Sequence, residues 1–129
     1  MIEEDYVSFD TAKLLKEKGF DERVKSYFTD DGLEGYMFGT GRKSNSELEE
    51  CFYSRPTLQM AMKWLREVHN YDVCICLDSY VEPFGNDYYI LIRRKNDRYE
   101  NISPCEQVFF KTYEEACEAG IKYVLENLI

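Results

Sequence analysis

The chain has 129 residues, which is the size of a single domain, and a formal net charge of −9. Hydrophobic residues make up 44% of it and aromatic residues 16%, and this composition excludes a wholly disordered chain. The negative charge disfavours general binding to nucleic-acid phosphates or to an anionic membrane surface.

We predict one domain over residues 1–129. Residues 1–50, with 13 acidic and 7 basic side chains, are its less regular acidic part, and residues 51–129 are a helix-strand-strand-strand-helix core. No run approaches the ~20 apolar residues of a membrane span, and the first residues lack the basic and apolar regions of a signal peptide. We therefore expect a cytoplasmic protein with no membrane contact.

The N-terminal part is expected to contain a helix and a β-hairpin. Ser8 or Asp10 can cap a helix over residues 9–18, and Gly19 is suited to the position just after its end. Aromatic runs on both sides of residues 29–32, which read Thr-Asp-Asp-Gly, indicate the hairpin. Residues 39–50 are polar without periodicity, which favours an exposed loop, and residues 51–53 favour a short strand.

A second helix is predicted after Pro56, which fits a first helical position, with Ser54 or Thr57 as alternative caps. It should end near residues 69–70. Its apolar residues recur at helical spacing; they are Leu58, Ala61, Met62, Leu65 and Val68.

Strands and a last helix are expected in the remainder. Apolar residues alternate with Asp and Cys over 71–78, which indicates a strand with one core face. A short connection favours antiparallel pairing with a strand at 88–95, and residues 107–110 are predicted to add a third. Thr112 and Glu115 have the spacing of a capping box at the start of the last helix. Its predicted buried stripe is Ala116, Cys117, Gly120, Ile121, Val124 and Leu128.

These elements predict an α+β fold. We expect a small antiparallel sheet of three main strands plus an N-terminal hairpin, with about three helices packed mainly on one face.

One basic cluster spans the end of the strand at 88–95 and is a possible nucleic-acid contact, because basic groups among aromatic rings can bind single strands. The order helix, three strands, helix over 57–128 is also similar to that of double-stranded-RNA-binding domains. Those domains carry basic residues at the start of the last helix, where this chain has Glu114 and Glu115. Shielding of a sheet edge is the alternative interpretation of the cluster. Its residues are Arg93, Arg94, Lys95, Arg98 and Tyr99.

Three patterns that could indicate a catalytic or ligand-binding site are incomplete in this sequence. Residues 39–44 contain two glycines and a lysine, but Arg42 separates the last glycine from Lys43, so the phosphate-loop motif is broken. His69, the sole histidine, is expected to end a helix. The five cysteines lack metal-ligand spacing; they are Cys51, Cys74, Cys76, Cys105 and Cys117. The sequence therefore predicts no catalytic residue, no metal site and no cofactor.

Three segments carry a resemblance to known proteins. Residues 7–20, 56–69 and 112–119, in that order, are similar to segments of small proteins from gut bacteria and from their phages and mobile elements. That group has no established activity, so the resemblance implies an origin and no site residues.

Three functions stay open at this point. The first is a non-enzymatic protein-interaction or accessory protein, whose partner is another protein, because aromatic residues are enriched at interfaces. The second is a nucleic-acid-binding domain that uses the region from Arg93 to Arg98, which the net charge disfavours. The third is an enzyme that uses Cys51 or Cys105, for which a low thiol pKa is required.

Overall fold

A computed structural model describes residues 2–78, 87–94 and 108–129. Within them the fold belongs to the α+β class, as predicted. No helix in this part of the chain has both the length and the apolar composition that crossing a bilayer requires. The elements in order are α1 (Phe9–Glu17), β1 (Ser26–Phe28), β2 (Glu34–Tyr36), β3 (Tyr53–Ser54), α2 (Leu58–Val68), β4 (Tyr71–Asp78), β5 (Asp87–Arg94) and α3 (Tyr113–Asn127).

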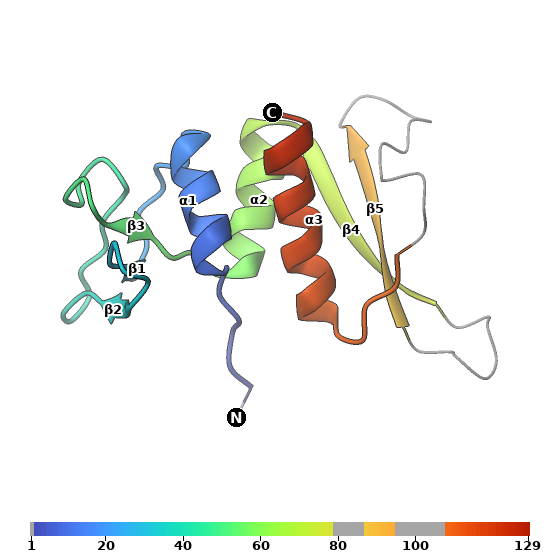
Figure 1. Ribbon diagram of the computed structural model, residues 1–129, viewed down its shortest axis with the longest axis horizontal. Helices are drawn as coiled ribbons and strands as arrows, with labels where there is room; N and C mark the ends of the chain where they lie inside the picture. The colour runs from blue at the N-terminus through green and yellow to red at the C-terminus, as the bar shows by residue number, and fades with distance from the viewer. Residues whose placement is uncertain (1, 79–86, 95–107) are drawn as a thin grey trace.

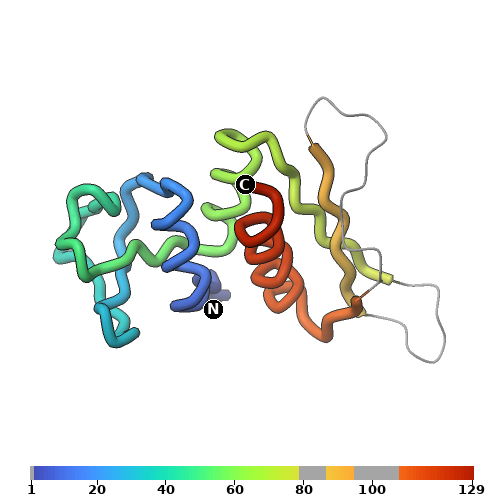
Figure 2. The backbone as a smooth tube through the Cα atoms, turned by 45° about the horizontal axis from the view of Figure 1, so that its top comes forward, coloured from blue at the N-terminus to red at the C-terminus, as the bar shows by residue number. Residues whose placement is uncertain are grey.

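The helices lie between two separate antiparallel sheets (Figure 1). One sheet has the strand order β2-β1-β3, and the other is the β4-β5 pair. Helices α2 and α3 cover one face of β4-β5, as expected, while the predicted N-terminal hairpin lies on the opposite side of the helical layer (Figures 1 and 2). The core is therefore formed mainly by helix faces buried from two sides.

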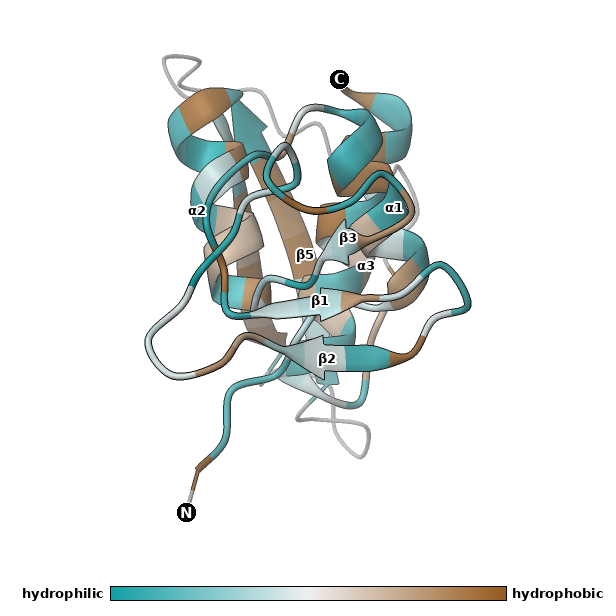
Figure 3. Ribbon diagram, turned by 90° about the vertical axis from the view of Figure 1, so that its left-hand side faces the viewer, coloured by the Kyte–Doolittle hydropathy of each residue, from teal (hydrophilic) through white to brown (hydrophobic). Residues whose placement is uncertain are grey.

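The N-terminal sheet forms around the turn that the sequence predicts. Gly32 has a φ of 85°, its N–H donates to the Thr29 carbonyl, and the Thr29 N–H donates to the Leu33 carbonyl over 2.8 Å. This turn sets β1 antiparallel to β2 (Figure 3). The short strand expected at residues 51–53 is found at Tyr53–Ser54, where it pairs with the other edge of β1.

Both ends of α1 agree with the prediction. The Ser8 hydroxyl accepts the Thr11 N–H over 3.2 Å, and Gly19 follows the helix with a φ of 94°. The Phe20 N–H then donates to the Leu15 carbonyl over 2.8 Å. Phe20 is buried against Trp64 of α2, with ring centroids 5.3 Å apart, so this helix end also fixes a core contact.

Helix α2 is capped by Thr57, one of the two alternative caps, and Pro56 lies before the helix and not in its predicted first position. The Thr57 hydroxyl accepts the Met60 N–H over 3.1 Å. Pro56 stays extended because its carbonyl accepts the Val7 N–H over 3.1 Å, which holds the N-terminal segment alongside residues 56–58. The helix ends at His69 and Asn70 as expected, and Asn70 has a φ of 64°.

The β4-β5 pair and α3 form the other half of the core. Tyr71 and Val73 of β4 are buried as predicted, whereas Leu77, at the far end of the same face, is 50% exposed. The third strand expected at 107–110 is represented, in the described residues, by a single bridge between Phe110 and Tyr88; residue 107 lies outside them. Thr112 caps α3 as predicted by accepting the Glu115 N–H over 3.1 Å, but the second bond of a capping box, from the Thr112 N–H to the Glu115 side chain, is absent among the described residues.

The segment 39–50, predicted as an exposed loop, is exposed only in part. Ser44 and Asn45 are buried, and the Asn45 side chain bonds two distant backbone groups. It donates to the Phe20 carbonyl over 2.7 Å and accepts the Ser54 N–H over 2.8 Å. A polar side chain can be buried at low cost when each of its groups is paired in this way. Hydropathy alone therefore misjudged the position.

Candidate functional site

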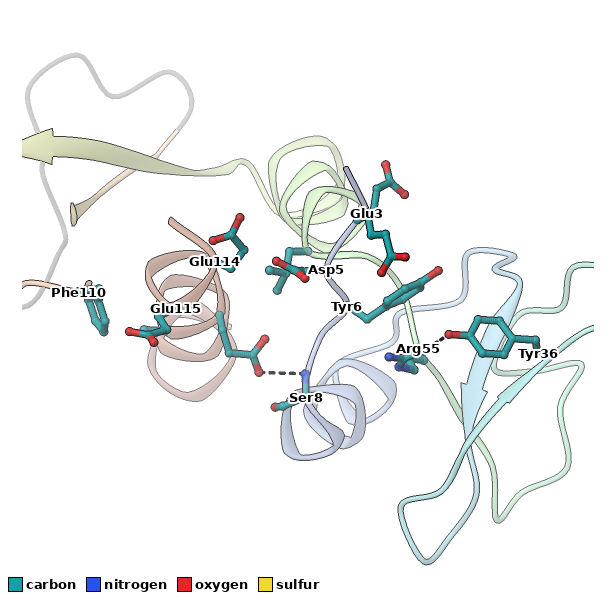
Figure 4. Close-up of a pocket in the computed structure, with 13 residues that line it drawn as sticks. Glu3, Asp5, Tyr6, Ser8, Tyr36, Arg55, Phe110, Glu114 and Glu115 are labelled. Carbon is teal, nitrogen blue, oxygen red and sulfur yellow. Dashed lines mark hydrogen bonds between the residues drawn. The ribbon is translucent and has the colours of Figure 1, made fainter. Parts of the chain in front are cut away.

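A candidate site is the groove between the N-terminal segment and the start of α3 (Figure 4). Its volume is about 810 Å³, which lies in the range of ligand-binding clefts. Phe110 and Glu115 lie at the α3 side, and Tyr6, Arg55 and Tyr36 lie at the opposite side. We call this feature the acidic groove, after the carboxylates that line it, which are Glu3, Glu4, Asp5, Glu114, Glu115 and Glu118.

The acidic groove brings together carboxylates from the two ends of the chain. The bonds of the Val7 and Leu58 N–H groups to the Pro56 and Asp5 carbonyls hold the N-terminal acids in place. The Thr112 cap fixes the first turn of α3, where the helix dipole favours acidic residues. In the described part of the chain, none of these six carboxylates forms an ion pair with Lys or Arg.

Glu118 links α3 to the start of α1. Its Oε1 accepts the Ser8 N–H over 3.1 Å and the Thr11 hydroxyl over 2.6 Å. Its Oε2 is buried and has no hydrogen-bond partner among the described residues. An unpaired buried carboxylate oxygen is costly, and a donor brought by a ligand can relieve that cost.

Arg55 forms the other side of the acidic groove and is held by several contacts. Its Nη1 donates to the Tyr36 hydroxyl over 2.9 Å and to the Ser26 hydroxyl over 3.1 Å, and its Nη2 lies 3.4 Å from Glu34. The guanidinium carbon lies 4.0 Å from the centre of the Tyr6 ring, within the range of a cation–π contact. Its charge is therefore already engaged, and the groove keeps an excess of negative charge.

The predicted basic cluster is only partly visible. Arg93 lies opposite Asp72 on β4, and Arg94 donates from Nη2 to the Tyr71 hydroxyl over 3.1 Å. As neighbours on one strand, the two arginines point to opposite faces of the sheet. Lys95, Arg98 and Tyr99 lie outside the described residues, so the nucleic-acid contact stays a prediction.

Two thiols of the described residues, Cys74 and Cys117, have a raised pKa, which disfavours the thiolate that a nucleophile requires. Burial raises the pKa of Cys117 to about 11, and burial also raises the pKa of Cys74. Cys51 is exposed, and Cys105 lies outside the described residues. His69 packs edge-on against Trp64, with ring centroids 4.7 Å apart. Within residues 2–78, 87–94 and 108–129, no group of three His, Cys, Asp or Glu side chains could hold a metal ion.

The raised pKa of Cys117 predicts a pH dependence of stability. A pKa of about 11 in the folded state, against an ordinary value of 9.0, means that the unfolded chain ionises first. The stabilising contribution is therefore complete below pH 9.0 and is lost as the pH rises towards about 11. We expect Cys117→Ala, measured by urea unfolding across this range, to lose less stability with rising pH than the wild type, by at most about 2 kcal/mol. Parallel curves for the two proteins would contradict this account.

Comparison with protein families, with curated proteins and with solved structures gives no match to this chain. The resemblance to small proteins of gut bacteria and phages accordingly stays a prediction, and the function has to be argued from the groove itself.

Proposed function

We propose that the protein is a non-enzymatic interaction protein that binds a basic segment of a partner protein in the acidic groove. The observation that carries this proposal is the set of six carboxylates around one groove, none of which has a cationic partner in the described part of the chain. Lys and Arg side chains supply the charge and the donors that such a groove lacks.

The geometry favours an extended or loosely structured peptide over a compact ion. The acids come from both sides of the groove, so a bound chain can meet Asp5 on one side and Glu114 on the other. Tyr6 and Phe110 add aromatic surface at which the aliphatic stems of Lys or Arg can pack. Glu118 lines the groove and adds a sixth carboxylate, whose Oε2 has no hydrogen-bond partner among the described residues.

Titration with a defined peptide tests the proposal. We expect a short fluorescent peptide of alternating Lys, Arg and Gly to bind the wild type, and the binding to weaken at higher salt because exposed charges are screened. The variant Glu3→Gln/Glu114→Gln/Glu115→Gln should bind at least about tenfold more weakly, which corresponds to 1.4 kcal/mol of binding free energy. Glu118 is left intact because it holds α1.

The matched control removes the same charge elsewhere. Glu17, Glu22 and Glu49 are exposed and do not line the acidic groove, so the triple Glu-to-Gln variant at these positions has the same net charge as the groove variant. We expect its affinity to stay within about threefold of the wild type. An equal loss in both variants would show that the peptide responds to net charge alone, and the proposal would then be rejected.

A further inference from the structure

A second cavity lies beside the acidic groove and has the opposite charge. Its volume is about 510 Å³, and it shares Glu4, Tyr6 and Arg55 with the groove. The segment before β1, the loop around Arg42 and the first turns of α2 form the rest of it. We call it the basic pocket; its cationic residues are Arg23, Lys25, Arg42, Arg55 and Lys63.

Two of these cations are already paired and three are not. Arg23 binds Glu47 through two bonds of 2.8 and 3.2 Å, and Arg55 lies 3.4 Å from Glu34. Lys25, Arg42 and Lys63 are exposed and have neither an ion pair nor a side-chain hydrogen bond among the described residues. Glu4 is the single carboxylate in the lining, so three free cations outweigh it.

The backbone adds to this positive charge. The basic pocket includes Thr57, Gln59 and Met60, which are the N-cap and two first-turn residues of α2, a helix of 11 residues. A helix N-terminus carries a partial positive charge, which favours anions. The Leu58 and Met60 N–H groups already donate to the Asp5 carbonyl and the Thr57 hydroxyl, so α2 contributes mainly this partial charge. The Arg55 side chain is 11% exposed, and its Nε is buried with no acceptor among the described residues.

We propose that the basic pocket binds a small phosphorylated molecule. Its phosphate lies among Lys25, Arg42 and Lys63 at the start of α2, because ammonium donors, a guanidinium donor and the helix dipole converge there. The volume exceeds that of a bare phosphate and is in the range of small-molecule sites, so the rest of the ligand packs against Tyr6 and Met60. The net charge of the chain opposes this only weakly, since charges beyond about 8 Å are screened at physiological salt.

Calorimetric titration with pyrophosphate and with ATP tests this assignment. We expect saturable binding of both to the wild type. The variant Lys25→Gln/Arg42→Gln/Lys63→Gln should bind both at least about tenfold more weakly. The control Lys13→Gln/Lys111→Gln/Lys122→Gln removes three cations outside the basic pocket, each of which forms a surface ion pair. This variant should bind both ligands within about threefold of the wild type.

Three results overturn the proposal. The first is the absence of saturable binding at about 10 mM ligand. The second is an equal loss of affinity in the pocket variant and the control variant. The third is binding of single-stranded RNA without binding of pyrophosphate or ATP. The last result would indicate a polynucleotide site. Circular dichroism confirms that each variant is folded. The groove variant at Glu3, Glu114 and Glu115 should keep its affinity for pyrophosphate, so this test and that of the peptide fail independently.

Discussion

Asn45→Ala is expected to lower the free energy of unfolding by about 3 kcal/mol. Asn45 is 8% exposed and bonds the Phe20 carbonyl and the Ser54 N–H at the same time. Alanine removes the side-chain donor and acceptor of Asn45 and so leaves the Phe20 carbonyl and the Ser54 N–H without these bonds. Each buried backbone group left unpaired costs about 1–3 kcal/mol. The variant also removes one of the links between the segment after α1 and β3, although the Phe9–Tyr53 ring contact still joins α1 to β3.

Urea unfolding followed by circular dichroism measures this loss. Thr40→Ala changes an exposed residue in the same segment and should alter stability by less than about 0.5 kcal/mol. Asn45→Asp keeps an acceptor for Ser54 but places a carboxylate oxygen against the Phe20 carbonyl, so it should also destabilise the fold. A loss below about 1 kcal/mol for Asn45→Ala would show that water replaces both bonds.

Gly120→Ala is expected to lower the free energy of unfolding by about 2 kcal/mol, although alanine is the better helix former by about 1 kcal/mol. A Cβ at Gly120 would lie 2.6 Å from Cγ1 of Val73 and 3.4 Å from Cγ2 of Ile90. α3 therefore packs on the β4-β5 pair at a distance that only glycine allows at this position. The variant must move the helix or force Val73 out of its buried rotamer.

A double-mutant cycle separates this clash from other effects. Val73→Ala removes the methyl group that lies closest, so Gly120→Ala should cost little or should stabilise the protein when Val73 is already alanine. Gly19→Ala, at a site with φ of 94° and no atom within 4 Å of the added Cβ, is a backbone-strain control that Val73→Ala should not rescue. Additive effects of Gly120→Ala and Val73→Ala would mean that the contact is not the cause.

The elements that depend on neighbouring residues were predictable from the sequence. Ser8, Gly19 and Thr112 act at the helix ends where cap preferences place them, because a cap needs only the nearest amides or carbonyls. The alternation over 71–78 indicated the buried face for the first half of β4, where Tyr71 and Val73 lie, since a strand has a period of two. Local chemistry was sufficient in each of these cases.

Features built from distant residues were not predictable in the same way. Glu118 meets Ser8 across 110 positions, so the acidic groove has no local signature. Glu114 and Glu115 lie in the first turn of α3, as the sequence predicts, and they also line the acidic groove, which no local pattern indicates. Pro56 failed as a helix start because its carbonyl is used by Val7, which local preference does not record.

The basic pocket illustrates the same point for a rejected motif. Residues 39–44 do not form a phosphate loop, and Arg42 is the residue that breaks the pattern. The fold nevertheless places Arg42 beside the start of α2, together with Lys25 and Lys63. The spacing of residues 39–44 excludes a phosphate loop, but it carries no information about the basic pocket, which depends on the tertiary fold.

Arg55 faces both cavities, and this has a thermodynamic consequence. If a ligand in one cavity shifts the guanidinium, it also changes the surface offered to a ligand in the other. Linkage then requires each ligand to alter the affinity of its counterpart by the same factor. Two ligands of opposite charge would thus change each other's binding affinity through one side chain, without contact between them and without rearrangement of a helix or a sheet.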